Sequence, residues 1–157
     1  MDIITVSLFG HREILDLRRL DSKLFPIVKS LMSRHEYITF LIGRNGEFDE
    51  YSASIIKRAQ KVMGKELSEL NLVLPYSVKN IEDYEKYYDN IIIPESVSGA
   101  YYKGAIAQRN RQMVEESDLV LVYVDKQSGG AFTAMKYAEK LNKRVINLCD
   151  VDEQYFL

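Results

Sequence analysis

The chain has 157 residues, 46% of them hydrophobic and 28% charged, and a formal net charge of −2, which suits one globular domain with its own core. No block of like charges is present, so the sequence shows no broad basic surface for nucleic acid, and we do not expect nucleic acid as a partner. A local basic patch stays open as an alternative. A single cysteine, Cys149, excludes an intramolecular disulfide, and two histidines far apart in sequence, His11 and His35, argue against a metal site.

The first predicted strand, residues 3–9, leads into the turn Gly10-His11-Arg12. In such a turn an arginine can bind a phosphate through its planar guanidinium, and a histidine can donate a hydrogen bond or stack. The alternative is an ordinary surface turn with a solvated arginine. A helix is predicted next, over residues 17–34, with a kink or a break at Pro26.

The second predicted strand, residues 37–42, is followed by the loop Gly43-Arg44-Asn45-Gly46 and by a helix with an apolar stripe. The two glycines of this loop permit a positive φ or a close approach of the backbone. Glu47 and Asp49 lie in the first turn of the helix. They either complement the helix dipole and cap the helix, or they bind a ribose or serve as a general base.

The third predicted strand, residues 70–74, ends at Pro75. Residues 76–104 are predicted as an irregular, tyrosine-rich insertion with a short strand at 91–93, and they hold six of the eleven tyrosines. Tyrosines here could stack on a base as a lid, but more often such residues form a subunit interface or a small local core.

A helix predicted over residues 105–117 places Arg109 on the same stripe as Ile106 and Met113. An arginine on a buried stripe needs an anionic partner. This partner is either a bound phosphate or a carboxylate such as Glu115 or Glu116.

The predicted strand at 118–124 is apolar almost throughout, as expected where both faces of a parallel sheet are covered. A turn of small residues, Ser128 to Ala131, follows it and opens a helix. The free N–H groups at such a helix start are a ready site for a phosphate or a carboxylate. A last strand is predicted to end at Leu148.

Strands and helices therefore alternate, which predicts a three-layer, Rossmann-like α/β domain with a mostly parallel sheet flanked by helices. We find no repeat and no linker, so residues 1–157 are expected to form a single domain. The unusual residues follow strands, and ligands of such sheets bind at the carboxyl ends of the strands.

The order of these motifs resembles that of the SLOG superfamily of Rossmann-like domains, from Thr5 to Leu148. This superfamily includes the YpsA-like bacterial proteins, the DNA-processing protein DprA and the LOG enzymes. The resemblance implies a nucleotide or nucleotide-derived ligand at the sheet edge. The residues expected to bind the ligand or its phosphate are Gly10, His11, Arg12, Gly43, Gly46, Arg109, Asn110, Ser128, Gly129, Gly130 and Thr133, with Glu47 and Asp49 expected at the ribose.

The LOG enzymes cleave the N-glycosidic bond of nucleoside monophosphates, and their signature is Pro-Gly-Gly-x-Gly-Thr-x-x-Glu after a helical Arg. The matching positions are Arg109, Gly129, Gly130 and Thr133. The departures are Ser128 for the Pro, Phe132 for the third Gly and Lys136 for the catalytic Glu. A lysine has the wrong charge to stabilise the positive charge that develops in glycoside cleavage, so a binding function is favoured over catalysis.

Our leading hypothesis is therefore a sensor or signalling domain that binds a small nucleotide-type ligand without a cofactor. The alternative is an N-glycosidic-bond hydrolase or transferase with Glu47 or Asp49 as the catalytic candidate. Binding of single-stranded DNA, by analogy with DprA, is a third hypothesis, and the net charge argues against it. We expect a cytoplasmic protein without membrane contact, because no apolar run approaches the ~20 residues that span a bilayer, and a homo-oligomer, most simply a dimer.

Overall fold

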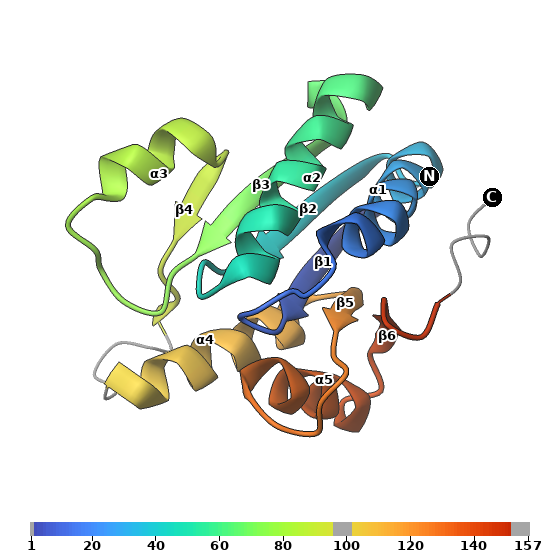
Figure 1. The fold of residues 1–157 in the computed structure, drawn as a ribbon. Helices are drawn as coiled ribbons and strands as arrows, with labels where there is room; N and C mark the ends of the chain where they lie inside the picture. The colour runs from blue at the N-terminus through green and yellow to red at the C-terminus, as the bar shows by residue number, and fades with distance from the viewer. Residues whose placement is uncertain (1, 96–101, 152–157) are drawn as a thin grey trace.

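Six parallel strands form one sheet in the order β4-β3-β2-β1-β5-β6, in a computed structural model that describes residues 2–95 and 102–151 (Figure 1). The strands are β1 Ile3–Gly10, β2 Tyr37–Ile42, β3 Ser68–Val73, β4 Asn90–Ile92, β5 Leu119–Tyr123 and β6 Arg144–Asn147. Each neighbouring pair is parallel. The predicted Rossmann-like class is confirmed.

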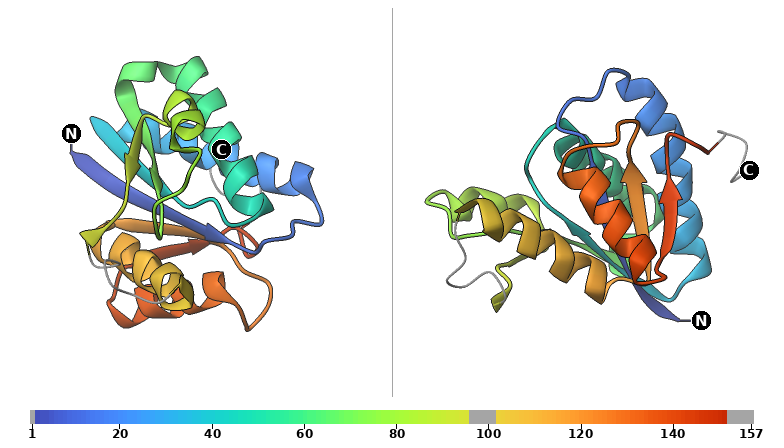
Figure 2. Two further views of the ribbon diagram at one scale, coloured as in Figure 1. Left: turned by 90° about the vertical axis from the view of Figure 1, so that its left-hand side faces the viewer. Right: turned by 90° about the horizontal axis from the view of Figure 1, so that it is seen from below.

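Helices cover both faces of the sheet, as Figures 1 and 2 show. The helices are α1 Leu17–Arg34, α2 Glu47–Met63, the 3-10 turn η1 Lys65–Leu67, α3 Ile81–Tyr87, α4 Tyr102–Glu116 and α5 Gly130–Lys140. Side chains of α1 and α2 share one buried cluster with one face of the sheet, and those of α4 and α5 share a second cluster with the other face. The short helix α3 lies at the β4 edge (Figure 1).

The buried strand β5 shows why this arrangement follows from the sequence. Its side chains alternate between the two clusters, with Leu119 and Leu121 on the α1–α2 side and Val120 and Val122 on the α4–α5 side. Because both faces are covered, every position of the strand is buried and must be apolar.

Helix α1 continues through Pro26, so the predicted break does not occur. A proline inside a helix costs about 3 kcal/mol or more. Leu24, Ile27 and Val28 lie on both sides of Pro26 and are almost fully buried, and this packing offsets the cost. The helix begins at Leu17 and is capped by Asp16, whose side chain accepts a hydrogen bond from the Arg19 N–H at 3.1 Å.

The tyrosine-rich segment that we predict as irregular holds the helix α3 and the strand β4 within its described part. Tyr84 and Tyr88 contact each other edge to face, with ring centroids 6.4 Å apart, and Tyr88 is buried. These two tyrosines therefore form a local core rather than a lid. Residues 96–101 of the predicted insertion, Tyr101 among them, lie outside the described residues, and α4 begins at Tyr102, earlier than predicted.

Among the helices of the described residues, none combines the length and the apolar character needed to cross a membrane.

Candidate functional site

The carboxyl ends of β1 and β5 lie side by side, with Gly10 in register with Tyr123. From β1 the chain continues to strands on one side of the sheet, and from β5 it continues to β6 on the other side. Such a reversal is the topological switch point where open α/β sheets bind ligands. The loops after these two strands carry the Gly-His-Arg turn and the small-residue turn singled out in the sequence.

A cavity of about 190 Å³ lies at this switch point. We call it the switch-point cavity. Its lining residues are Phe9, Gly10, His11, Arg12, Asn45, Asp49, Ile106, Arg109, Asn110, Gly129, Gly130 and Ala131. Most of the predicted binding residues therefore meet here, whereas Gly43, Gly46, Glu47, Ser128 and Thr133 are not part of the lining.

Gly43 and Gly46 allow close approach of neighbouring groups. A Cβ on Gly43 would lie 2.8 Å from Nη1 of Arg109, and a Cβ on Gly46 would lie 2.5 Å from the Cα of Arg12. Of the two predicted reasons for these glycines, close approach is the correct one. A positive φ occurs at Gly129, where it is 94°.

Arg109 is buried beneath the cavity, with 2% of its surface exposed. Its Nη1 donates to the Val73 carbonyl oxygen at 2.8 Å, and its Nε donates to Oδ1 of Asn110 at 2.8 Å. Burial lowers the pKa of the Arg109 guanidinium, and the negative charge of Asp49 opposes that shift. Asp49 is therefore the carboxylate whose charge acts on Arg109, and the bound phosphate suggested from the sequence stays a prediction.

The two carboxylates suggested for Arg109 have other partners. Glu115 accepts a hydrogen bond from the Tyr137 hydroxyl at 2.8 Å, and Glu116 accepts one from Gln112 at 2.7 Å. Both lie near the end of α4, more than one helical turn beyond Arg109. The prediction that either one pairs with Arg109 is wrong.

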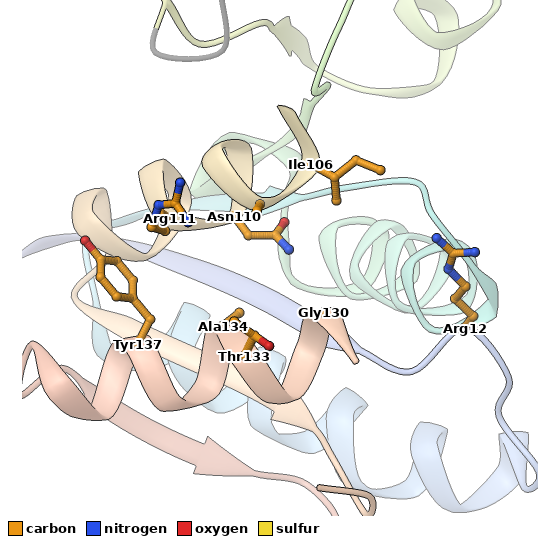
Figure 3. A pocket seen from close by; sticks show the side chains of 9 residues that line it. Arg12, Ile106, Asn110, Arg111, Gly130, Thr133, Ala134 and Tyr137 are labelled. Carbon is orange, nitrogen blue, oxygen red and sulfur yellow. The ribbon is translucent and has the colours of Figure 1, made fainter. Parts of the chain in front are cut away.

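The bond from Arg109 also sets the orientation of the Asn110 amide. Because Oδ1 accepts from Arg109, the Nδ2 group is the one that points towards α5, 3.8 Å from where a Cβ of Gly130 would be (Figure 3). Asn110 thus presents hydrogen-bond donors to the cavity.

Asp49 accepts a hydrogen bond from the Asn45 N–H at 2.9 Å. Burial raises the pKa of Asp49 from 3.8 to about 6, although that hydrogen bond and the charge of Arg109 both favour the ionised form.

Glu47 accepts a hydrogen bond from the Ile14 N–H at 3.3 Å, and its own N–H donates to the Arg12 carbonyl at 2.7 Å. Glu47 therefore ties the β1–α1 loop to α2.

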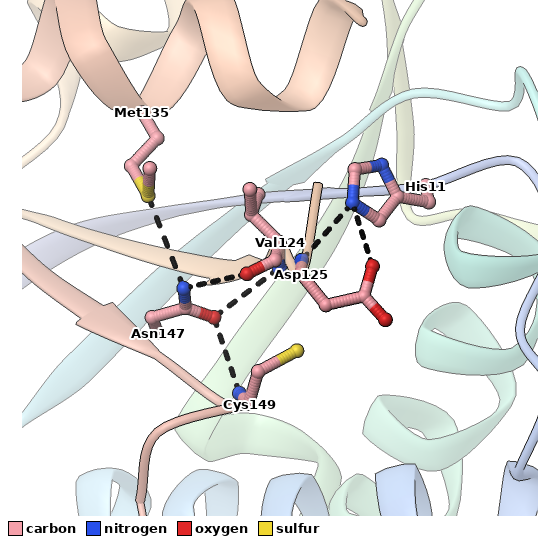
Figure 4. A network of polar contacts seen from close by, with 6 residues as sticks. All are labelled: His11, Val124, Asp125, Met135, Asn147 and Cys149. Carbon is pink, nitrogen blue, oxygen red and sulfur yellow. Dashed lines mark hydrogen bonds and ion pairs between the residues drawn. The ribbon is translucent and has the colours of Figure 1, made fainter. Parts of the chain in front are cut away.

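His11 joins the loops after β1 and β5 (Figure 4). Its Nε2 accepts a hydrogen bond from the Asp125 N–H at 3.1 Å and lies 3.2 Å from Oδ1 of the same residue.

Beside His11, Asn147 bridges the ends of β5 and β6. Its Nδ2 donates to the Val124 carbonyl at 2.9 Å, and its Oδ1 accepts from the N–H groups of Val124 and Cys149. The sequence offers no signal for Asn147, since it resembles any polar residue at the end of a strand.

A larger hollow of about 560 Å³ adjoins the switch-point cavity between α4 and α5 (Figure 3). The two spaces share Arg12, Ile106, Asn110 and Gly130, so we treat them as one α4–α5 groove. The residues that line only the larger hollow are Ala107, Arg111, Thr133, Ala134 and Tyr137. Figure 3 shows Tyr137 and Arg111 at one end of this groove and Arg12 at the other.

No model of a protein family matches the sequence, and a comparison with curated proteins finds no match. Solved structures do match. The DNA processing protein A (DprA) of Streptococcus pneumoniae aligns with a TM-score of 0.64 and 15% identity over 91% of this chain and 49% of its own. The DprA of Helicobacter pylori, whose structure describes a single-stranded DNA binding mode, aligns with a TM-score of 0.58 and 15% identity over 90% of this chain and 63% of its own. The chain thus spans about half of the first neighbour and less than two thirds of the second.

These neighbours correct two predictions. The leading hypothesis of a nucleotide sensor is contradicted, because the proteins that share the fold process DNA and one of them binds single-stranded DNA. The exclusion of nucleic acid is wrong for the same reason. Net charge averages over the whole surface, whereas Arg12 and Arg111 place positive charge at the two ends of one groove.

Proposed function

We propose that this chain binds single-stranded DNA along the α4–α5 groove. The observation that carries the proposal is the composition of the groove. Its polar groups include the cations Arg12 and Arg111 and the donor amide of Asn110, and its walls are apolar, with one tyrosine. A positively charged groove with an aromatic platform is the arrangement that holds a single strand without reading its sequence.

The phosphate would lie at the start of α5. The first N–H groups of a helix have no partner within the helix, and the helix dipole favours an anion there. Gly129, with its positive φ, turns the chain into the helix, and Thr133 donates both its N–H and its hydroxyl to the Gly129 carbonyl, each at 3.0 Å. This turn is therefore fixed before a ligand arrives, and Arg12 and Asn110 flank it.

A base would lie against Tyr137 and Ala134 at the other end of the groove. The Tyr137 hydroxyl donates to Glu115 on α4, so the ring is held in place across the two helices. Stacking of a base on such a ring contributes about 1–3 kcal/mol. Lys136, which replaces the LOG glutamate, lies outside the groove and pairs with Glu139 at 3.5 Å.

The fold neighbours support this assignment because both are DNA processing proteins. We further propose that the chain is a single domain of the SLOG superfamily, with the residues of the groove as its binding site. The supporting observations are the order of the motifs and the meeting of seven predicted binding residues around one cavity, namely Gly10, His11, Arg12, Arg109, Asn110, Gly129 and Gly130.

The test is fluorescence anisotropy with a labelled oligothymidylate of about 16 nucleotides, the upper end of common site sizes. Tyr137→Ala should weaken binding by about 1–3 kcal/mol, whereas Tyr137→Phe, which keeps the ring, should bind nearly as wild type does. The double variant Arg12→Gln, Arg111→Gln should make the slope of log K against log salt less negative by about 1.4.

A double variant with Lys140→Gln and Arg144→Gln is the matched control, because both side chains are exposed and neither lines the groove. Absence of binding to the wild-type chain at low salt would overturn the proposal. Equal losses in the control and in the groove variants would overturn the placement in the groove.

A further inference from the structure

A second hollow, of about 610 Å³, lies between α2 and α3, on the face of the sheet opposite the α4–α5 groove. We call it the lysine hollow. It is lined by Lys57, Gln60, Lys61, Lys65, Glu85, Lys86, Tyr87, Tyr88 and Asp89.

Positive charge converges on this hollow from α2, η1 and α3. Four lysines face two carboxylates there, and Asp89 already accepts hydrogen bonds from the Leu70 N–H and from Gln60. Lys57 is held by the Tyr87 carbonyl oxygen at 2.6 Å and lies 4.0 Å above the Tyr87 ring. The lysines Lys61, Lys65 and Lys86 are exposed. The positive charges of these lysines repel one another because they share one hollow, and a bound anion would reduce that repulsion.

Arg44 connects the lysine hollow with the switch-point cavity. It follows β2 and precedes Asn45, which lines the cavity. Its guanidinium lies 5.0 Å above the Tyr84 ring, and its Nη1 lies 3.4 Å from the hydroxyl of Tyr88, which lines the hollow. Glu50 balances part of its charge at 3.1 Å. A cationic and aromatic path therefore begins at the carboxyl edge of the sheet with Arg44 and continues past Tyr84 and Tyr88. It ends at the hollow, which lies towards the end of α2 and the start of β3.

We infer that the lysine hollow binds the phosphates of the same single strand after it leaves the α4–α5 groove and passes Arg44. This inference rests on the proposed function. The path past Arg44 and the aromatic residue Tyr87, which is 39% exposed beside the lysines, favour a nucleic-acid strand over an acidic protein segment. The binding track would then run over both faces of the sheet, and long strands would bind more tightly than short ones.

The test compares oligothymidylates of about 5 and about 16 nucleotides, since the short one can fill the groove alone. The triple variant Lys61→Gln, Lys65→Gln, Lys86→Gln leaves Lys57 and its contacts intact. It should bind the short strand as wild type does and the long strand on the order of tenfold more weakly at low salt. For the long strand, the slope of log K against log salt should become less negative by about 2.

The matched control is the triple variant Arg34→Gln, Lys140→Gln, Arg144→Gln, which removes the same charge from exposed positions outside both sites. Equal affinity of the lysine variant and wild type for the long strand would overturn the inference and leave the hollow to an acidic protein partner. Equal losses in both triple variants would overturn it as well, because the effect would then be one of net charge. Failure of the wild-type chain to bind even the short strand would instead refute the proposed function itself.

Discussion

Asp49 lines the switch-point cavity, and two effects act on its pKa in opposite directions: burial raises it, and the positive charge of Arg109 lowers it. Burial raises its pKa to about 6, well above the 3.8 of an ordinary aspartate. Between about pH 4 and pH 6 the folded chain therefore holds a proton that the unfolded chain has released. The contribution of Asp49 to the free energy of unfolding is therefore present at the acidic end of that window and is lost as the pH rises through 6.

We expect Asp49→Asn to unfold at higher urea concentration than wild type at pH 7.5 and to lose this advantage at pH 4.5. The difference should be on the order of 1–3 kcal/mol, because the asparagine carries no charge to desolvate. Urea unfolding at the two pH values measures it. Glu36→Gln, which removes an exposed carboxylate, is the control. A difference between Asp49→Asn and wild type that is the same at both pH values would contradict the assignment.

At the scale of elements, the packing of α4 on the sheet depends on the missing side chain of Gly43. A Cβ at this position would lie within 3.2 Å of three guanidinium atoms of Arg109. Gly43→Ala should therefore destabilise the chain by about 1–3 kcal/mol, since Arg109 is buried and hydrogen-bonded to Val73 and cannot withdraw without breaking that bond.

The matched control is Gly104→Ala, in the helix that carries Arg109. Among the described residues, a Cβ at Gly104 would meet no atom within 4 Å apart from its chain neighbours and the backbone of its own helix, so alanine should stabilise the helix by about 0.5–1 kcal/mol. Chemical denaturation of both variants measures the two changes. Opposite signs are expected, and a stabilised Gly43→Ala variant would show that Arg109 does not need this space.

Patterns of the sequence predict the elements and the edge of the sheet where the site lies, because strand and helix periodicity and glycine-rich turns are local properties. The partners of Arg109 and the role of Glu47 were not predictable, since each depends on which loop lies opposite. Asn45 and Ile106 also line the cavity without a sequence signal. Ile106 looks like one more apolar residue of a helix stripe, and Asn45 looks like a loop residue.

At the scale of the whole molecule, the net charge says little about whether part of the surface can bind a polyanion. A chain of net charge −2 can still carry a cationic groove on one face of its sheet and four lysines around a hollow on the other. What matters for a polyanion is the local field within about 10 Å, the screening length at 0.1 M salt. Acidic residues elsewhere on the surface do not cancel it.

A strand bound along the α4–α5 groove should slow hydrogen exchange in some segments of the chain and leave others unchanged. The amides at the start of α5, residues 130–132, should exchange on the order of tenfold more slowly with oligothymidylate present, because they have no partner within the helix and would bind a phosphate. The amides of β6 and of the last turn of α1 should be unchanged, since neither segment lines the α4–α5 groove or the lysine hollow.

Mass-spectrometric hydrogen exchange with and without the strand measures both regions in one experiment. The Tyr137→Ala chain serves as the control, because weaker stacking should reduce the protection of residues 130–132 at a fixed strand concentration. Slower exchange spread evenly over all segments would indicate general stabilisation rather than a defined track. Protection confined to the last turn of α1 or to β6 would place the strand on a surface that has neither the groove's arginines nor its tyrosine, and the charge argument would then be wrong.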